Sequence, residues 1–174
     1  MEKSKVKPYL EASTNVAVLT LVLVVLTVLA WGYFVNKQRP AFQNGLQKGQ
    51  SLTQLSNLDY SSAPQTLLII MNTHCSFCAE SMSFYKQLVK AQHENGNLSH
   101  IVAVFPNPES EVKEYLQQNQ LQIDTIPNVD FRLLNVSGTP TIILTDNKGK
   151  ILDFWIGKLP EETELQIIKV ITAT

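Results

Sequence analysis

The amino-acid sequence predicts an α/β fold in which a mixed β-sheet is flanked by helices and preceded by one N-terminal transmembrane helix. Two observations predict it. In the C-terminal part of the chain, short continuous apolar runs typical of buried strands alternate with segments whose apolar residues recur at helical spacing. Ahead of them, the stretch from Ala12 to Asn36 contains no charged residue and is long enough to cross a bilayer.

The apolar stretch predicts a transmembrane anchor at residues 15–36. As a helix, Val16 to Val35 rises about 30 Å, which matches the hydrocarbon core of a lipid bilayer. A buried helix of a soluble protein normally carries a polar stripe, and this stretch has none. A cleaved signal peptide is the nearer alternative, because a basic segment precedes the apolar run. No small-x-small cleavage motif follows, which favours an uncleaved anchor.

The anchor divides the chain into four predicted parts. Residues 1–14 are expected to form a cytoplasmic tail, 37–63 a linker that becomes an edge segment, and 64–174 the folded domain. The linker is rich in Gln, Asn, Ser and Gly. The net charge is −1 with both signs mixed, so the chain lacks the broad cationic face that binds phosphate backbones, and nucleic acid is not expected as a partner.

Four apolar runs in the domain are predicted strands. The last two are joined by Asp146-Asn147-Lys148-Gly149, whose turn-forming residues indicate a hairpin. The first two are each followed by helical spacing, which indicates crossover connections. The predicted strands are Thr66–Met71, Ile101–Phe105, Thr141–Thr145 and Ile151–Ile156.

Three segments have the apolar spacing of helices with one buried face. They follow Cys75, Ser110 and Pro160. The resulting order, β-α-β-α-β-β-α, implies a mixed sheet covered by helices on both sides. The residues expected on the buried faces are Cys78, Met82, Tyr85, Leu88 and Val89 in the first helix, Val112, Tyr115 and Leu116 in the second, and Leu165, Ile168 and Ile171 in the last.

The chain has two cysteines, Cys75 and Cys78, separated by two residues. Cys75 falls where a strand ends and a helix begins, so free backbone N–H groups and the helix dipole are expected to favour its thiolate, the form that attacks disulfides. Cys78 lies one turn later, expected to be more buried and placed to resolve a mixed disulfide. This spacing suits redox chemistry in an oxidising compartment, so we expect the domain on the extracytoplasmic side of the membrane.

The alternative for the cysteine pair is a structural or metal site. Zinc normally takes four ligands, and the remaining candidates are His74, His93 and His100, with no second pair of cysteines. A closed zinc site is therefore hard to assemble, which favours redox chemistry. An open copper site completed by His74 remains an alternative.

Three features in order resemble a known family. Leu67 to Met71 followed by Thr73-His74-Cys75-Ser76-Phe77-Cys78 resembles a central strand with its active-site turn. Val136-Ser137-Gly138-Thr139-Pro140-Thr141 resembles a segment ending in a cis-proline, and Asp146 to Gly149 with Trp155-Ile156-Gly157 resembles a closing hairpin. Over about Gly49 to Ala173 the chain thus resembles the thioredoxin superfamily, specifically its exported, membrane-tethered TlpA/ResA-like members.

The resemblance implies a role for each site residue. Cys75 would be the nucleophile, Cys78 the resolving thiol, and Pro140 a cis-proline facing the pair. The backbone of Thr139 would then lie alongside Cys75, where a substrate strand can pair with it. The implied activity is that of a membrane-anchored thiol–disulfide oxidoreductase without a cofactor, acting on cysteine-containing exported proteins and exchanging electrons with a membrane partner.

The sequence departs from the family pattern at three places. His74 stands where the family usually has Trp, Ser76-Phe77 separates the cysteines, and Ile69 occupies the strand position where thioredoxin has a buried Asp. An imidazolium beside a thiolate lowers its pKa, so His74 is expected to assist Cys75, against the alternative of a solvated loop histidine. Glu80 is the nearest carboxylate in sequence that could move protons for Cys78, although its favourable place near the helix dipole is the simpler explanation.

Two other functions remain as alternatives. A copper-handling domain would hold Cu(I) through the two soft thiolates and His74. A peroxiredoxin-like peroxidase would oxidise Cys75 to a sulfenic acid that Cys78 resolves. That branch usually has a Pro and a Thr at set places before its cysteine, whereas here Thr73 precedes Cys75 by two residues without a nearby proline.

Overall fold

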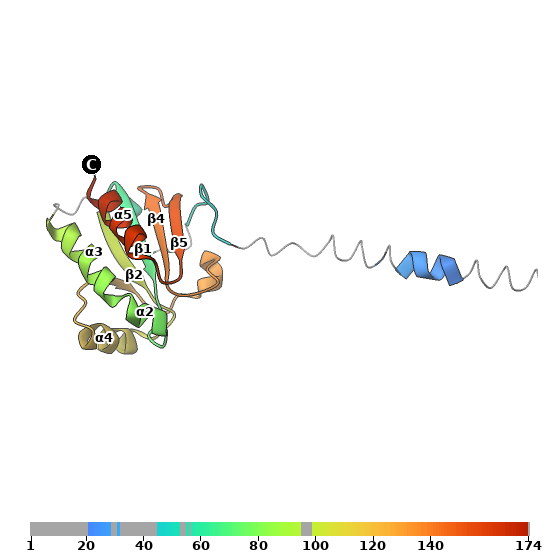
Figure 1. Ribbon diagram of the computed structural model, residues 1–174, viewed down its shortest axis with the longest axis horizontal. Coiled ribbons are helices and arrows are strands. Elements are labelled where there is room, and N and C mark those ends of the chain that lie inside the picture. Colours follow the sequence, from blue (N-terminus) through green and yellow to red (C-terminus); the bar gives the residue numbers. More distant parts are fainter. Residues whose placement is uncertain are drawn as a thin grey trace, which may run out of the picture. The chain divides into compact units, whose positions relative to one another are not determined.

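The computed structural model of the chain divides into two compact units, residues 1–44 and 45–174, each considered by itself (Figure 1). In the first unit, residues 21–28 are helical and exposed. The predicted tail and most of the predicted anchor lie outside the described residues. Among described helices, none combines the length and apolarity needed to cross a membrane. The structure describes residues 21–28, 31, 45–52, 55, 57–94 and 99–173.

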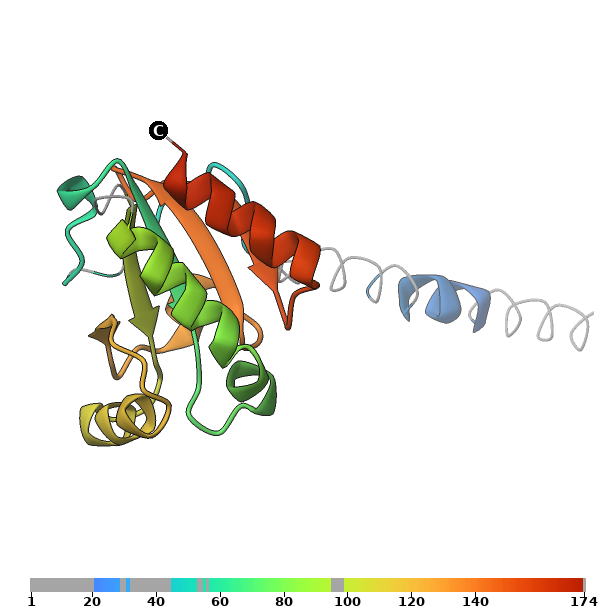
Figure 2. The ribbon, with the colours of Figure 1, turned by 60° about the vertical axis from the view of Figure 1, so that its left-hand side comes forward.

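A mixed sheet forms the centre of the second unit (Figures 1 and 2). Within the described residues it has five strands in the order β3-β2-β1-β4-β5. Strand β1 pairs in parallel with β2 and antiparallel with β4, while β4 and β5 form the antiparallel hairpin. The strands are β1 (Gln65–Ile70), β2 (Ser99–Val104), β3 (Asp124–Ile126), β4 (Thr141–Asp146) and β5 (Ile151–Ile156).

The four predicted strands are confirmed, with ends within two residues of those expected. Strand β3 was not predicted. It has three residues, none of them fully buried, and pairs in parallel with the end of β2 at Val102–Val104. A segment this short and exposed gives no hydrophobic pattern to detect.

The predicted helices are also present, but the first is divided. Its two parts, α2 and α3, meet at Ser81, whose ψ of 3° departs from helical geometry. Short 3-10 helices η1 and η2 were not predicted. The described helices of this unit are α2 (Ser76–Glu80), α3 (Met82–Glu94), α4 (Glu109–Gln118), α5 (Glu161–Thr172), η1 (Tyr60–Ser62) and η2 (Phe131–Leu134).

The two faces of the sheet are covered differently. Buried residues of the four described α-helices of this unit join one core cluster. They pack against Leu67 and Ile69 of β1 and against Met71, the residue after the strand. In Figures 1 and 2, α3 and α5 lie side by side over this face. The opposite face, with Leu68 and Ile70, is covered by η2 and by apolar residues from 46–55.

The sheet is flanked by helices as expected, but the helical cover that the structure describes on the second face is the short 3-10 helix η2. The second face is filled by Leu46, Leu52 and Leu55, which are 5%, 0% and 6% exposed. These leucines come from the segment predicted as linker, where their irregular spacing gives no helical or strand period. Burial of three leucine side chains ties this segment to the sheet by the hydrophobic effect.

One predicted core residue is wrong. Leu165 of α5 is 49% exposed, whereas Ile167 and Ile171 are 0% and 2% exposed. Residues 167 and 171 are four apart and share a helical face, while residue 165 lies about 200° around the helix from 167. Four-residue spacing to Ile171 thus identifies Ile167 as the core position.

Candidate active site

The cysteine pair lies where β1 gives way to α2. Cys75 is the N-cap of α2, with extended backbone geometry, and its sulfur accepts a hydrogen bond from the backbone N–H of Cys78 at 3.2 Å. Both thiols are free. Cys75 is partly exposed, whereas Cys78 is 0% exposed and belongs to the main core cluster. The two sulfurs therefore occupy different environments although they lie one helical turn apart.

The environment of Cys75 favours its thiolate. Partial burial acts against ionisation, but hydrogen bonds with the side chains of Cys78 and Thr139 and with the backbone N–H groups of Cys78 and Phe77 outweigh it. The net effect lowers the pKa of Cys75 below its ordinary value. A thiolate held by several donors at a helix start is the arrangement of a reactive cysteine.

The environment of Cys78 has the opposite effect. Burial, followed by the hydrogen bond with Cys75, raises the pKa of Cys78 to about 12. At neutral pH Cys78 is therefore a thiol, and Cys75 ionises first. The pair thus contains one accessible nucleophile and one protected thiol next to it.

The loop before β4 runs alongside Cys75. The Thr139–Pro140 peptide bond is cis, as the resemblance implies. The Cys75 thiol donates to the carbonyl oxygen of Thr139 at 3.3 Å, and Pro140 accepts a hydrogen bond from the backbone N–H of Gly157 at 2.7 Å. The structure therefore brings Cys75, Cys78, Thr139 and Pro140 together.

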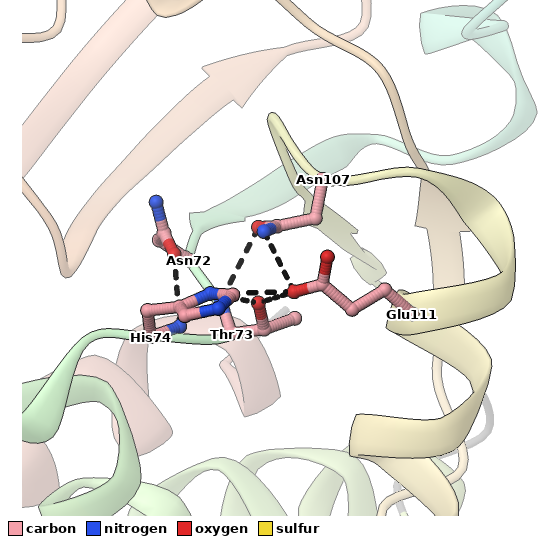
Figure 3. Close-up of polar contacts among 5 residues, drawn as sticks. All are labelled: Asn72, Thr73, His74, Asn107 and Glu111. Atoms are coloured by element: carbon pink, nitrogen blue, oxygen red, sulfur yellow. Dashed lines mark hydrogen bonds and ion pairs between the residues drawn. The ribbon is translucent and has the colours of Figure 1, made fainter.

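The His74 side chain lies in a polar network with Thr73 and Glu111 (Figure 3). Its Nδ1 lies 2.9 Å from the hydroxyl of Thr73 and 3.3 Å from the carboxylate of Glu111. The Thr73 hydroxyl donates its single proton to Glu111, so its oxygen is free to accept from His74. We therefore assign a proton to Nδ1 of His74.

The same network joins the active-site turn to α4. Asn107 accepts a hydrogen bond from the backbone N–H of Thr73 at 3.2 Å and donates to Glu111 at 2.9 Å (Figure 3). Asn72 caps the turn by accepting from the backbone N–H of His74 at 2.9 Å. Four polar contacts thus fix the residues immediately before Cys75.

These contacts bear on the expected roles of nearby groups. The described polar partners of the His74 ring are Thr73 and Glu111, so its assistance to the Cys75 thiolate remains a prediction. Glu80 accepts a hydrogen bond from Lys158 at 2.7 Å and points to that partner. Across the residues that the structure describes, no three His, Cys, Asp or Glu side chains gather as metal ligands, and His74 does not complete a copper site with the cysteines.

Sequence reasoning did not identify Thr73, Asn107 and Glu111 as a network. A topological signal was available. Asn107 follows β2 as Thr73 follows β1, and the carboxyl ends of adjacent parallel strands meet at one edge of a sheet. Polar residues just beyond two such strands are therefore candidates for contact even though Thr73 and Asn107 are 34 positions apart.

Comparison with known proteins supplies a structural likeness but no match in sequence. No family model and no curated protein matches the chain. Among solved structures, the thioredoxin domain of a thiol-disulfide oxidoreductase from Bacteroides vulgatus aligns with a TM-score of 0.58 and 16% identity, over 74% of this chain and 99% of that one. StoA from Bacillus subtilis aligns with a TM-score of 0.52 and 18% identity, over 62% and 81%. A thiol:disulfide interchange protein from Bacteroides sp. aligns at 0.55 and 17%, over 67% and 79%.

The fold is thioredoxin-like. The resemblance drawn from the sequence motifs is thereby confirmed at the level of the fold. In this thioredoxin-like domain, Cys75 caps the start of α2 after β1, Cys78 lies in α2, and the loop before β4 carries the cis-proline Pro140. One fold can host many activities, so function has to be argued from these residues and their chemistry.

Proposed function

We propose that the chain is a thiol–disulfide oxidoreductase that works through Cys75 and Cys78. One observation carries the proposal, namely the opposite environments of the two sulfurs. Cys75 is accessible and its pKa is lowered, whereas Cys78 is buried and its pKa is raised to about 12. Nucleophilic attack followed by resolution requires this division of labour.

Reduction of a substrate disulfide would proceed in two exchanges. The Cys75 thiolate attacks one substrate sulfur, forming a Cys75–substrate bond while the substrate disulfide breaks and its other sulfur leaves with the electron pair and takes up a proton. Cys78 then attacks the sulfur of Cys75, so that a Cys75–Cys78 disulfide forms and the substrate leaves as a second thiol. The dithiol loses two electrons and the substrate disulfide gains them, and the reverse sequence oxidises a substrate.

The surroundings of Cys75 suit an extended protein segment. The Thr139 carbonyl lies beside the sulfur, at the start of a strand whose neighbour β5 ends at Ile156. Phe77, two residues after Cys75, and Ile156, which pairs with Thr141 next to Pro140, are 54% and 55% exposed. We propose that backbone pairing at Thr139 and apolar contact with Phe77 and Ile156 bind a cysteine-containing protein.

We further propose the cellular setting that the sequence suggests. Residues 15–36 anchor the chain in a lipid bilayer through Val16 to Val35, and the thioredoxin-like domain lies on the extracytoplasmic side. Its substrates are exported proteins with cysteines, and a membrane partner supplies or accepts the electrons. Support comes from the charge-free stretch ahead of the domain and from the cysteine pair, which are independent features of the chain.

The test is catalysed reduction of insulin by dithiothreitol, with the full-length chain in a mild detergent. The wild type should accelerate the reaction, Cys75→Ala should abolish the acceleration, and Cys78→Ala should accumulate a mixed disulfide between Cys75 and the substrate. Mass spectrometry after acid quenching detects that adduct. A wild type no faster than dithiothreitol alone, or full activity in Cys75→Ala, would refute the proposed activity.

A further inference from the structure

Three buried hydroxyl groups in the core that contains Cys78 have no hydrogen-bond partner of ordinary geometry, although the hydroxyls of Ser81 and Tyr85 interact with one another. They belong to Ser81, Tyr85 and Tyr115, and each oxygen exposes less than 1 Å². Ser81 and Tyr85 are 4% and 0% exposed as whole residues. Buried hydroxyls are normally paired, so a group of poorly paired ones calls for an explanation.

Helical spacing places two of these hydroxyls beside Cys78. Ser81 and Tyr85 follow Cys78 by three and seven residues, which are positions on one helical face. Although the ψ of Ser81 departs from helical geometry, hydrogen bonds of helical spacing continue across the α2–α3 junction, where the Ser81 N–H donates to Phe77 at 3.1 Å and the Tyr85 N–H donates to Ser81 at 3.2 Å. Both side chains therefore lie on the side of the helix that carries the resolving thiol.

The third hydroxyl belongs to another element that packs against the same core. Tyr115 of α4 packs against the core cluster of Cys78 and Tyr85, with its ring edge-on to Phe105 at 6.1 Å between centroids. Burial and then the negative charge of Cys78 raise the pKa of Tyr115 to about 12, and the same two causes raise the pKa of Tyr85. Both phenols thus sense a charge on the Cys78 sulfur.

In the described part of the chain, no carboxylate is among the groups that act on the ionisation of Cys78. After burial, the groups that act on the pKa of Cys78 are Cys75, the Asn72 backbone and Thr139. Ile69, in the middle of β1, is apolar and fully buried. Of the groups that act on this pKa, the Asn72 backbone and Thr139 favour the thiolate, but they do not offset burial, and Cys78 must nevertheless carry negative charge when it attacks Cys75.

We propose that Ser81, Tyr85 and Tyr115 form a hydroxyl cluster that donates hydrogen bonds to the Cys78 sulfur as it becomes a thiolate. The inference rests on the proposed function and concerns its second exchange. Cys78 forms the bond to Cys75, the bond from Cys75 to the substrate breaks, and the proton lost by Cys78 equals the one taken up by the leaving substrate sulfur. Donors that gain a partner only when charge develops stabilise the transition state selectively. Tyr85 is therefore a catalytic residue for resolution.

Ellman's reagent separates the two exchanges in one stopped-flow trace of the reduced full-length chain. The first release of thionitrobenzoate reports attack by Cys75, and the second reports resolution by Cys78. Tyr85→Phe should slow the second release by about tenfold, the effect of losing one hydrogen bond to a charged group, and leave the first unchanged. Tyr85→Phe should also raise the melting temperature, since it removes a poorly paired buried hydroxyl.

Matched variants make the result decisive. Tyr60→Phe is the control, because Tyr60 donates to Leu52 at 2.8 Å and packs in the opposite core cluster. Ser83→Ala, on the exposed side of α3, is the control for Ser81→Ala. Tyr115→Phe should also slow the second release and leave the first unchanged, and it tests the proposal if Tyr85→Phe fails to fold. A higher melting temperature with an unchanged second release in both tyrosine variants overturns the hydroxyl cluster, whereas no second release in the wild type overturns the proposed function instead.

Discussion

At the residue scale, Cys75 and Cys78 have the same side chain and opposite chemistry. Hydrogen-bond donors at the start of α2 lower the pKa of Cys75, whereas burial in the core raises the pKa of Cys78. The sequence alone predicted this division, because a strand-to-helix transition at Cys75 places the second cysteine on the buried helical face. The spacing of the two cysteines was sufficient for this prediction, because the helix start at Cys75 and the buried helical face at Cys78 are both local features of the sequence.

The Cys78 side chain should hold the pKa of Cys75 down, since its hydrogen bond is the strongest of those that favour the thiolate. Cys78→Ala is therefore expected to shift the pKa of Cys75 upward. The pH dependence of iodoacetamide alkylation gives the pKa, with a wild-type midpoint below the ordinary value of about 8.5. The alkylation signal that disappears in Cys75→Ala is that of Cys75. An unchanged midpoint in Cys78→Ala would contradict the claim that the Cys78 side chain lowers the pKa of Cys75.

The contacts of Glu111 were beyond prediction at this scale. Thr73 and Glu111 are 38 positions apart, and their contact depends on how α4 is oriented beyond β2. Glu111, unlike Thr73, belongs to no recognisable motif. The sequence identified His74 beside Cys75 but gave no sign that a carboxylate from another element pairs with it.

At the element scale, the sequence predicted strands better than it predicted what covers them. Apolar runs identify β1, β2 and β4 because these central strands bury both faces, and the hairpin turn identifies their neighbour β5 at the edge of the sheet. The cover of the second face depends on scattered leucines in residues 46–55, whose burial no periodicity indicates. Strand β3 is too short to give a hydrophobic pattern, and it is identified by its parallel pairing with β2.

The contacts of Glu111 should stabilise the junction between the active-site turn and α4. Glu111→Gln removes the anionic partner of Thr73, Asn107 and His74, and we expect the free energy of unfolding to fall by about 1–2 kcal/mol. Urea unfolding of the full-length chain measures it. Glu114→Gln is the matched control on the same helix, where the carboxylate is exposed and pairs with Gln118. Equal effects of the two variants would rule out a special role for Glu111.

The β4–β5 hairpin should depend on Gly149. Its φ is +74°, and a Cβ there would lie 3.0 Å from the ring of Tyr60. Gly149→Ala is expected to lower the free energy of unfolding by about 1–2 kcal/mol through the left-handed backbone, with the clash adding to it. Gly45→Ala, where a Cβ meets nothing within 4 Å, is the control. Chemical denaturation that finds both variants as stable as wild type would contradict this.

At the scale of the whole molecule, the thioredoxin-like unit begins at Gly45, ahead of the domain start predicted at residue 64. The motifs identified the fold because CxxC follows β1, the cis-proline segment precedes β4, and the closing hairpin is formed by β4 and β5 of the same sheet. The position of the domain relative to a membrane rests on the sequence of residues 15–36 and stays a prediction.

Alkaline pH should destabilise the reduced chain. Burial raises the pKa values of Cys78, Tyr60 and Tyr115 to about 12 each, so the unfolded state loses these protons at lower pH than the folded state. Stability should then fall as pH rises above about 9, beginning with the thiol. Denaturation midpoints across this range test it. Cys78→Ala should lose the earliest part of the decline, and a midpoint that stays constant to about pH 11 would be inconsistent with these shifts.

The most direct test of the central claim is the redox equilibrium of Cys75 and Cys78 in the full-length chain, measured by thiol trapping in dithiothreitol buffers. We predict one reversible two-electron transition that disappears in Cys75→Ala. A midpoint near about −270 mV would assign a reductase and one near about −120 mV an oxidant. If both thiols stay reactive toward the trap under oxidising conditions and no intramolecular disulfide forms, the proposed chemistry is wrong.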